Sequence, residues 1–178
     1  MLEKTGIPTK EMIMEVFPSI DRINKGPVAV IECYQNIPCN PCQTACRFNA
    51  INIDDDINNL PVLNEVNCTG CGICLSKCPG LSIMIVDGSK SQENILVKIP
   101  YEFLPLPIEG SVVQGLDRAG EHIADVKVIN VLNPKSFDRT PVITIEVDRK
   151  YLYDIRNIGG TIAWEMKIQS FVDVQMLP

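Results

Sequence analysis

The stretch Cys68–Pro79 reads CTGCGICLSKCP, a run of the form C-x2-C-x2-C-x3-C-P. Its first three cysteines are spaced by three residues on a loop with two glycines, so their thiolates can reach one common centre. Backbone N–H groups of so tight a loop can point at sulfur atoms. The fourth thiol, Cys78, points elsewhere, and Pro79 directs the chain out of the turn because its φ is fixed and it has no N–H. The run therefore predicts a thiolate-ligand loop.

The cysteine spacing also occurs earlier in the chain, displaced by 32 positions. Three cysteines of the first half recur in the second half: Cys39, Cys42 and Cys46 as Cys71, Cys74 and Cys78. The residues that follow are similar as well, CRFNAINI at 46–53 and CPGLSIMI at 78–85. Each half is predicted to form a cysteine-bearing turn, a short helix and a strand. We interpret the segment as an internal duplication.

With these motifs, residues 28–88 resemble the bacterial-type two-cluster 4Fe-4S ferredoxin family, in which the last cysteine of each run ligates the other cluster. The resemblance implies two 4Fe-4S clusters with crossed ligands. The implied ligands of cluster 1 are Cys33, Cys39, Cys42 and Cys78. The implied ligands of cluster 2 are Cys68, Cys71, Cys74 and Cys46.

The first half departs from the family pattern at one ligand. Asn36 occupies the position that matches Cys68, and the nearest upstream cysteine is Cys33, three residues earlier. The longer loop Tyr34–Pro38 can bring Cys33 to the cluster corner, which gives a balanced total of eight thiolates. The alternative is a cluster whose fourth ligand is missing or unusual.

Zinc sites and disulfide bonds are the alternative structures that these eight thiols could form. Zinc ribbons normally have two separated C-x2-C pairs, whereas here three cysteines in succession are followed by C-P. A secreted disulfide framework spreads its bridges through the fold, but all eight cysteines lie within residues 33–78. Clusters are therefore the favoured interpretation.

The composition limits which classes of binding partner and which cellular location are expected. The 178 residues include 22 acids and 16 bases, a formal net charge of −6, which argues against nucleic acid and anionic membranes as partners. The single histidine, His122, excludes a site that needs several imidazoles. No secretory segment opens the sequence and no stretch reaches the ~20 apolar residues of a membrane span. A cytoplasmic location is expected, since free thiols persist there.

The rest of the chain is mainly patterned as strands. A helix is predicted at Thr9–Phe17 and a buried strand at Pro27–Glu32. Beyond the cysteines, strands are predicted at 95–99, 112–116, 123–132, 142–147 and 161–168, with a short helix at 149–155. The expected fold class is α+β, a duplicated ferredoxin-like cluster domain followed by a small mainly-β barrel or sandwich. The expected units are an N-terminal helix and strand (1–32), a two-cluster domain (33–88) and a β-rich docking domain (95–178).

The predicted function is electron transfer. No Ser-His-Asp set, Cys-His pair or flavin fingerprint is present, so no catalytic residues are assigned. The extra residues outside the repeat make the chain similar to the ferredoxin-like small subunit of anaerobic flavin-dependent dehydrogenases of the amino-acid or proline type. This resemblance implies partner subunits that carry FAD or FMN, or other redox proteins as partners. The alternative is a stand-alone soluble ferredoxin.

Overall fold

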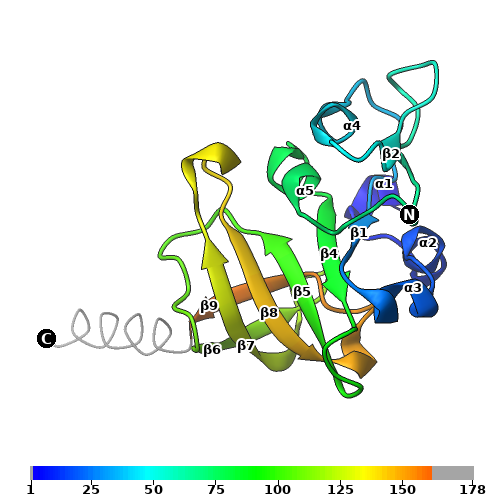
Figure 1. The fold of residues 1–178 in the computed structure, drawn as a ribbon. Coiled ribbons are helices and arrows are strands. Elements are labelled where there is room, and N and C mark those ends of the chain that lie inside the picture. Colours follow the sequence, from blue (N-terminus) through cyan, green and yellow to red (C-terminus); the bar gives the residue numbers. More distant parts are fainter. Residues whose placement is uncertain (1, 162–178) are drawn as a thin grey trace, which may run out of the picture.

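The computed structural model describes residues 2–161 and is built around one antiparallel sheet of seven strands (Figure 1). The strand order is β1-β4-β5-β8-β7-β6-β9, with β1 and β9 at the two edges. The strands are β1 (Val28–Ile31), β4 (Ile83–Asp87), β5 (Asn94–Pro100), β6 (Val112–Leu116), β7 (His122–Leu132), β8 (Val142–Asp148) and β9 (Asn157–Thr161). A separate two-stranded sheet pairs β2 (Ile51–Asn52) with β3 (Val62–Leu63).

Short helices flank the strands at the β1 end of the sheet (Figure 1). They are α1 (Leu2–Thr5), α2 (Lys10–Val16), α3 (Ile20–Lys25), α4 (Pro41–Ala45) and α5 (Ile73–Lys77), with 3-10 turns η1 (Lys135–Phe137) and η2 (Arg149–Tyr151). Helix α2 confirms the predicted N-terminal helix, because the side chain of Thr9 caps it by accepting a hydrogen bond from Met12 N–H. The helix predicted at 149–155 is only the 3-10 turn η2.

Strands β1 and β4 have apolar side chains on both faces, and each face packs against a different core. Successive side chains of a strand point to opposite sides. Met84 and Val86 of β4 join the main core, which includes Ile13 and Phe17 from the region of α2. Ile83 and Ile85 join a second core that contains buried cysteines. The cysteine loops and the N-terminal helices therefore cover opposite faces of this part of the sheet.

The predicted fold class is wrong, because it treats the cysteine segment as a duplicated cluster domain and the β-rich segment as a separate barrel or sandwich. Strand β4, which follows the second cysteine run, pairs with β1 on one side and with β5 on the other. The strands of the two presumed units therefore belong to one sheet. Within residues 2–161, this sheet ends at β1 and β9 and does not close into a barrel. The physical reason is the continuous burial of β4, whose five residues are all buried and need cover on both faces.

The strands of the second half lie close to their predicted positions. The alternating run predicted at 123–132 is β7, in which Val126 and Val128 are buried while Lys127 is exposed. The strands predicted at 95–99, 112–116 and 142–147 correspond to β5, β6 and β8. Residues 162–168 of the last predicted strand lie outside the described residues; Thr161 is the final residue of β9.

Candidate functional site

The cysteine repeat produces the same local structure twice. Helices α4 and α5 are each five residues long and are displaced by 32 positions, as the sequence repeat predicts. Each carries one buried cysteine, Cys42 or Cys74. Each ends at the last cysteine of its run, Cys46 or Cys78, whose N–H donates back to a carbonyl of its own helix. The duplication is therefore visible in the turns, although these turns do not form a domain of their own.

Backbone N–H groups donate to the sulfur atoms at equivalent places in the two turns. Ala50 N–H lies 3.3 Å from Cys46 Sγ, and Ser82 N–H lies 3.4 Å from Cys78 Sγ. A third such contact joins Ala29 N–H of β1 to Cys68 Sγ at 3.4 Å. Hydrogen bonds to sulfur stabilise the thiolate form, which is the form that ligates metals and clusters.

Four thiols from three parts of the chain form the first thiol group. It consists of Cys33, Cys39, Cys42 and Cys78. Burial is the main cause that raises the pKa of Cys42 to about 11, and the nearby thiols of Cys78 and Cys39 raise it further. The pKa of Cys33 is raised by burial and then by the same two neighbours. The fourth cysteine of the second run thus lies among the cysteines of the first run.

The other four thiols form the second thiol group, which consists of Cys46, Cys68, Cys71 and Cys74. Burial, followed by the neighbouring thiols of Cys68 and Cys71, raises the pKa of Cys74 to about 12, and Cys46 adds a smaller contribution. All four line one small cavity of about 20 Å³, whose wall also includes Gly70, Gly72, Phe48 and Ile85. Cys71 is exposed, so the second thiol group reaches the protein surface.

The donor set suits a multi-iron cluster. Within residues 2–161, no three His, Cys, Asp or Glu side chains approach closely enough to hold a single metal ion. The four irons of a cubane occupy more space than one ion, so its ligating sulfurs stand farther apart than those of a zinc site. Thiols with backbone N–H donors at three of their sulfurs are the kind of donor set that iron–sulfur clusters use. Because burial raises the pKa of Cys42 to about 11 and that of Cys74 to about 12, ligand binding by these two thiols releases protons at neutral pH.

Arg22 of α3 fixes the loop that begins at Cys68. Its Nη2 donates to Cys68 O at 2.6 Å and to Pro27 O at 3.1 Å. Its Nε donates to Glu65 O at 2.8 Å, and its Nη1 to Gly26 O at 2.9 Å. One guanidinium therefore joins the start of β1 to the segment that leads into the second thiol group.

Gly70 lies where the same loop approaches Pro27. Its φ is +62°, and a Cβ at this position would lie 2.5 Å from the Pro27 carbonyl carbon. Gly70→Ala should therefore lower the free energy of unfolding by about 1–3 kcal/mol more than Gly120→Ala. Gly120 is the matched control because its φ is +84° and its surroundings are open. Urea unfolding of the two variants measures the difference, and equal losses would show that the close approach to Pro27 is unimportant.

A buried ion network borders the first thiol group, and sequence reasoning missed it. Glu32, directly before Cys33, pairs with both Arg118 and Arg156; Arg156 Nε lies 2.9 Å from its carboxylate. Arg156 Nη2 also donates to Leu81 O, in the turn that follows Cys78. The only sequence signal was a glutamate at the end of an apolar strand. Through these contacts, the residues next to Cys33 and after Cys78 are joined to the β-rich half of the chain.

Comparisons with known proteins give a partial relationship. No family model matches the chain, and no solved structure matches it. Over 83 residues the chain is 35% identical to the aliphatic sulfonate oxidoreductase, polyferredoxin-like subunit of Pyrococcus furiosus. The match covers 44% of this chain and 43% of that protein, less than half of either. In the described residues, no helix is both long and apolar enough to cross a membrane. The match supports a broad relationship of this chain to iron–sulfur, ferredoxin-like proteins.

Proposed function

We propose that this chain is an electron-transfer subunit of a multi-subunit oxidoreductase and holds one 4Fe-4S cluster in each thiol group. The observation that carries the proposal is the exchange of cysteines between runs: Cys78 lies near Cys42, and Cys46 lines one cavity with Cys74. Bound clusters would supply one-electron redox chemistry. The similarity to a polyferredoxin-like oxidoreductase subunit supports the same function. The free thiols also favour a cytoplasmic location.

In this proposal, the protein's own residues hold and shield the redox centres. The thiols of each group supply the ligands, and the N–H groups of Ala50 and Ser82 donate to ligand sulfurs. The buried side chains of Ile83 and Ile85 pack against the same cysteines and keep water away. Hydrogen bonding and burial of this kind set the potential of a bound cluster.

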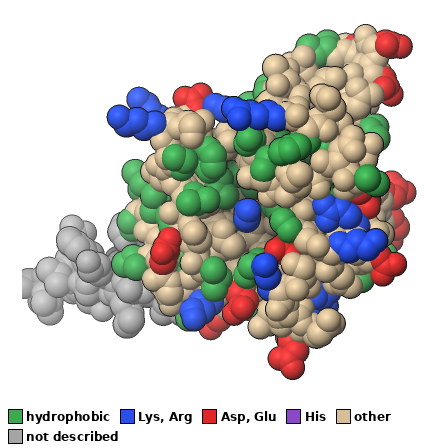
Figure 2. Space-filling view, in the orientation of Figure 1, with side chains coloured by type: hydrophobic (Ala, Val, Ile, Leu, Met, Phe, Trp, Pro, Cys, Tyr) green, Lys and Arg blue, Asp and Glu red, His purple; other side chains and the backbone are tan. Residues whose placement is uncertain are grey.

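The β-rich segment 95–178 is proposed to dock the partner subunits, which we expect to carry flavin. The connector between β5 and β6 supports this assignment, because Phe103, Leu104 and Ile108 are 62, 84 and 74% exposed. Figure 2 shows hydrophobic side chains gathered over the upper part of the sheet, with Lys and Arg side chains along their upper border. Apolar side chains exposed together are typical of a surface that a partner covers.

Iron and sulfide analysis tests the cluster proposal. The anaerobically reconstituted protein should contain about eight irons and about eight sulfides, two cubanes' worth, and should absorb visible light. A colourless protein that holds zinc at its thiols would contradict the proposal.

Co-purification tests the subunit role separately. A pull-down under anaerobic conditions, followed by flavin analysis, should recover a stable complex that contains FAD or FMN. A monomer that carries the expected iron and reduces several unrelated enzymes would instead support the stand-alone ferredoxin.

A further inference from the structure

The two cysteine turns end in the same backbone conformation. Asn49 and Leu81 occupy equivalent positions, 32 residues apart, and their φ values are +49° and +51°. In each turn, the N–H of the next residue donates to the sulfur of the last cysteine of its run. The left-handed conformation therefore accompanies both of these hydrogen bonds to sulfur.

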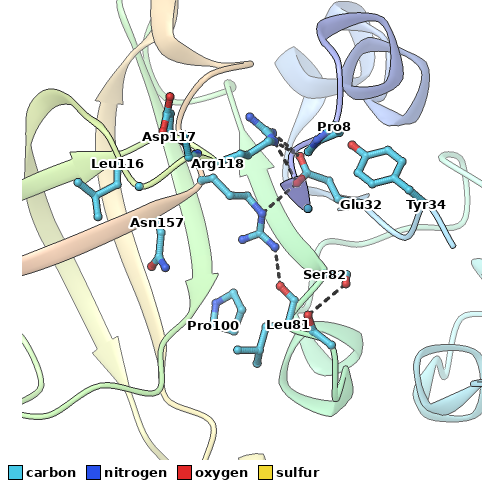
Figure 3. A pocket seen from close by; sticks show the side chains of 15 residues that line it. Pro8, Glu32, Tyr34, Leu81, Ser82, Pro100, Leu116, Asp117, Arg118 and Asn157 are labelled. Carbon is cyan, nitrogen blue, oxygen red and sulfur yellow. Dashed lines mark hydrogen bonds and ion pairs between the residues drawn. The ribbon is translucent and has the colours of Figure 1, made fainter. Parts of the chain in front are cut away.

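The residue types at the two positions are not equally suited to a positive φ. Asparagine adopts this conformation more readily than most residues, whereas an apolar residue such as leucine disfavours it. Leu81 therefore depends more on its surroundings than Asn49 does. Arg156, which directly precedes β9, supplies the support: its Nη2 donates to Leu81 O, a bond drawn as a dashed line in Figure 3.

Arg156 is itself held in place by β1. Its Nε lies 2.9 Å from a carboxylate oxygen of Glu32, and its side chain is only 18% exposed. The N–H of Glu32 also donates to Ser82 O at 2.8 Å. Arg156 and Glu32 together therefore fix two consecutive carbonyl groups of the turn that follows Cys78.

The carbonyl of Leu81 and the N–H of Ser82 belong to one peptide group. Arg156 donates to the oxygen of this group, and the N–H of the same group lies 3.4 Å from Cys78 Sγ. Successive hydrogen bonds polarise one another, and more strongly where the surroundings have a low dielectric constant. The positive charge at the carbonyl end therefore strengthens the N–H···S bond at the other end.

The first cysteine turn is matched to the second except for this arginine. Its peptide N–H lies 3.3 Å from Cys46 Sγ. Its next carbonyl, Ala50 O, accepts a backbone hydrogen bond from Asn64 at 2.8 Å, which corresponds to the bond at Ser82 O. Within residues 2–161, the guanidinium bond is found at the second turn alone. The duplicated turns are therefore chemically unequal because of a residue outside the repeat.

We propose that Arg156 is a positioning residue for the Cys78 sulfur. It acts through the Leu81–Ser82 peptide group, which it holds with the N–H toward the sulfur and polarises. The inference rests on the proposed function, because its consequence is a higher reduction potential for a cluster in the first thiol group. Hydrogen bonds to ligand sulfurs and nearby positive charge favour the reduced, more negative state.

Amide hydrogen exchange of the cluster-free, full-length protein tests the positioning step without iron. Arg156→Gln should speed the exchange of Ser82 N–H by about tenfold, because Leu81 loses a hydrogen bond from a charged group. Exchange of Ala50 N–H, the equivalent amide in the other turn, should stay the same. A general loss of stability would instead speed both amides.

Redox titration of the iron-loaded protein tests the effect on the potential. In a Cys74→Ser background, which should hold a cluster in the first thiol group alone, Arg156→Gln should lower the potential by about 59 mV, a tenfold change for a one-electron couple. The iron content should remain about four per chain. In a Cys42→Ser background, which leaves the second thiol group, the same substitution should not change the potential.

Arg118→Gln is the matched control for Arg156→Gln. Arg118 pairs with the same Glu32 carboxylate, but its further donation goes to Tyr153 O and not to the turn after Cys78. Its replacement removes the same charge and should have a much smaller effect on Ser82 exchange and on the potential. Equal effects of the two substitutions would overturn the proposal, because they would reflect overall charge.

Two further results would overturn the proposal: unchanged Ser82 exchange in Arg156→Gln, or an unchanged potential in a variant that keeps its iron. If Arg156→Gln does not fold, Arg156→Lys takes its place. Lysine keeps a cation for Glu32 but lacks the planar fork that serves two acceptors at once, so Ser82 exchange should still rise. Exchange as slow as in the unaltered protein would then reject the role of Arg156. Absence of iron from every protein, the unaltered chain included, would contradict the proposed function, and the exchange result would still decide the positioning role.

Discussion

Cys46→Ser should remove the iron of the second thiol group and leave that of the first, although Cys46 belongs to the first cysteine run. Cys42 lies one helical turn earlier in α4, yet its neighbours are Cys39 and Cys78. Cys42→Ser should therefore empty the first group instead. Each single variant should retain about four irons, because each leaves one set of four thiols complete.

Double variants make the crossed arrangement measurable by iron counting alone. Cys46→Ser with Cys74→Ser affects a single group, so about four irons should remain. Cys42→Ser with Cys46→Ser affects both groups, so almost no iron should remain. If each run held its own cluster, these two results would be exchanged, and the proposed ligand sets would have to be abandoned.

Cys33→Ser tests the ligand at which the sequence departs from the ferredoxin pattern. The thiol of Cys33 lies near those of Cys78 and Cys39, which supports its place in the first thiol group. Its replacement should lower the iron content of that group and change its spectrum. A variant that keeps about eight irons and an unchanged spectrum would assign Cys33 a structural role.

Glu32→Ala should strongly lower the free energy of unfolding. It removes the common partner of Arg118 and Arg156 and leaves two guanidinium groups largely buried without a carboxylate. Breaking a buried ion pair in this way costs about 3–5 kcal/mol. Urea unfolding of the cluster-free protein measures this loss without interference from iron.

Glu15→Ala is the matched control for Glu32→Ala, because Glu15 is an exposed acid in α2. It should change the free energy of unfolding by no more than about 0.5 kcal/mol. Similar losses in the two variants would mean that the buried network does not support the fold.

The local structure of the cysteine segment could be predicted because it depends on short-range features. The spacing of 32 residues between Cys42 and Cys74 is retained in helices α4 and α5, and tight turns leave the backbone few alternatives. Strand β7 could be predicted for a similar reason, since one face is exposed and polar residues alternate with apolar ones.

The fold class could not be predicted, because the sequence does not reveal what covers a strand that is apolar on both faces. The run Ile83–Asp87 is compatible with a small self-contained repeat and with the interior of a large sheet. The network at Glu32 escaped prediction for a different reason. Arg118 and Arg156 are 86 and 124 residues away from it, and nothing local marks such partners.

The position of β4 between β1 and β5 has a consequence for the order of events during biosynthesis. The ribosome completes all eight cysteines before it makes β5, β8 or the two arginines that hold Glu32. Until β5 has emerged, one edge of β4 is uncovered, and until Arg156 has emerged, Glu32 beside Cys33 lacks one of its two ion partners. The nascent chain thus exposes its thiols to oxidants and to stray metals before the first thiol group is fully assembled.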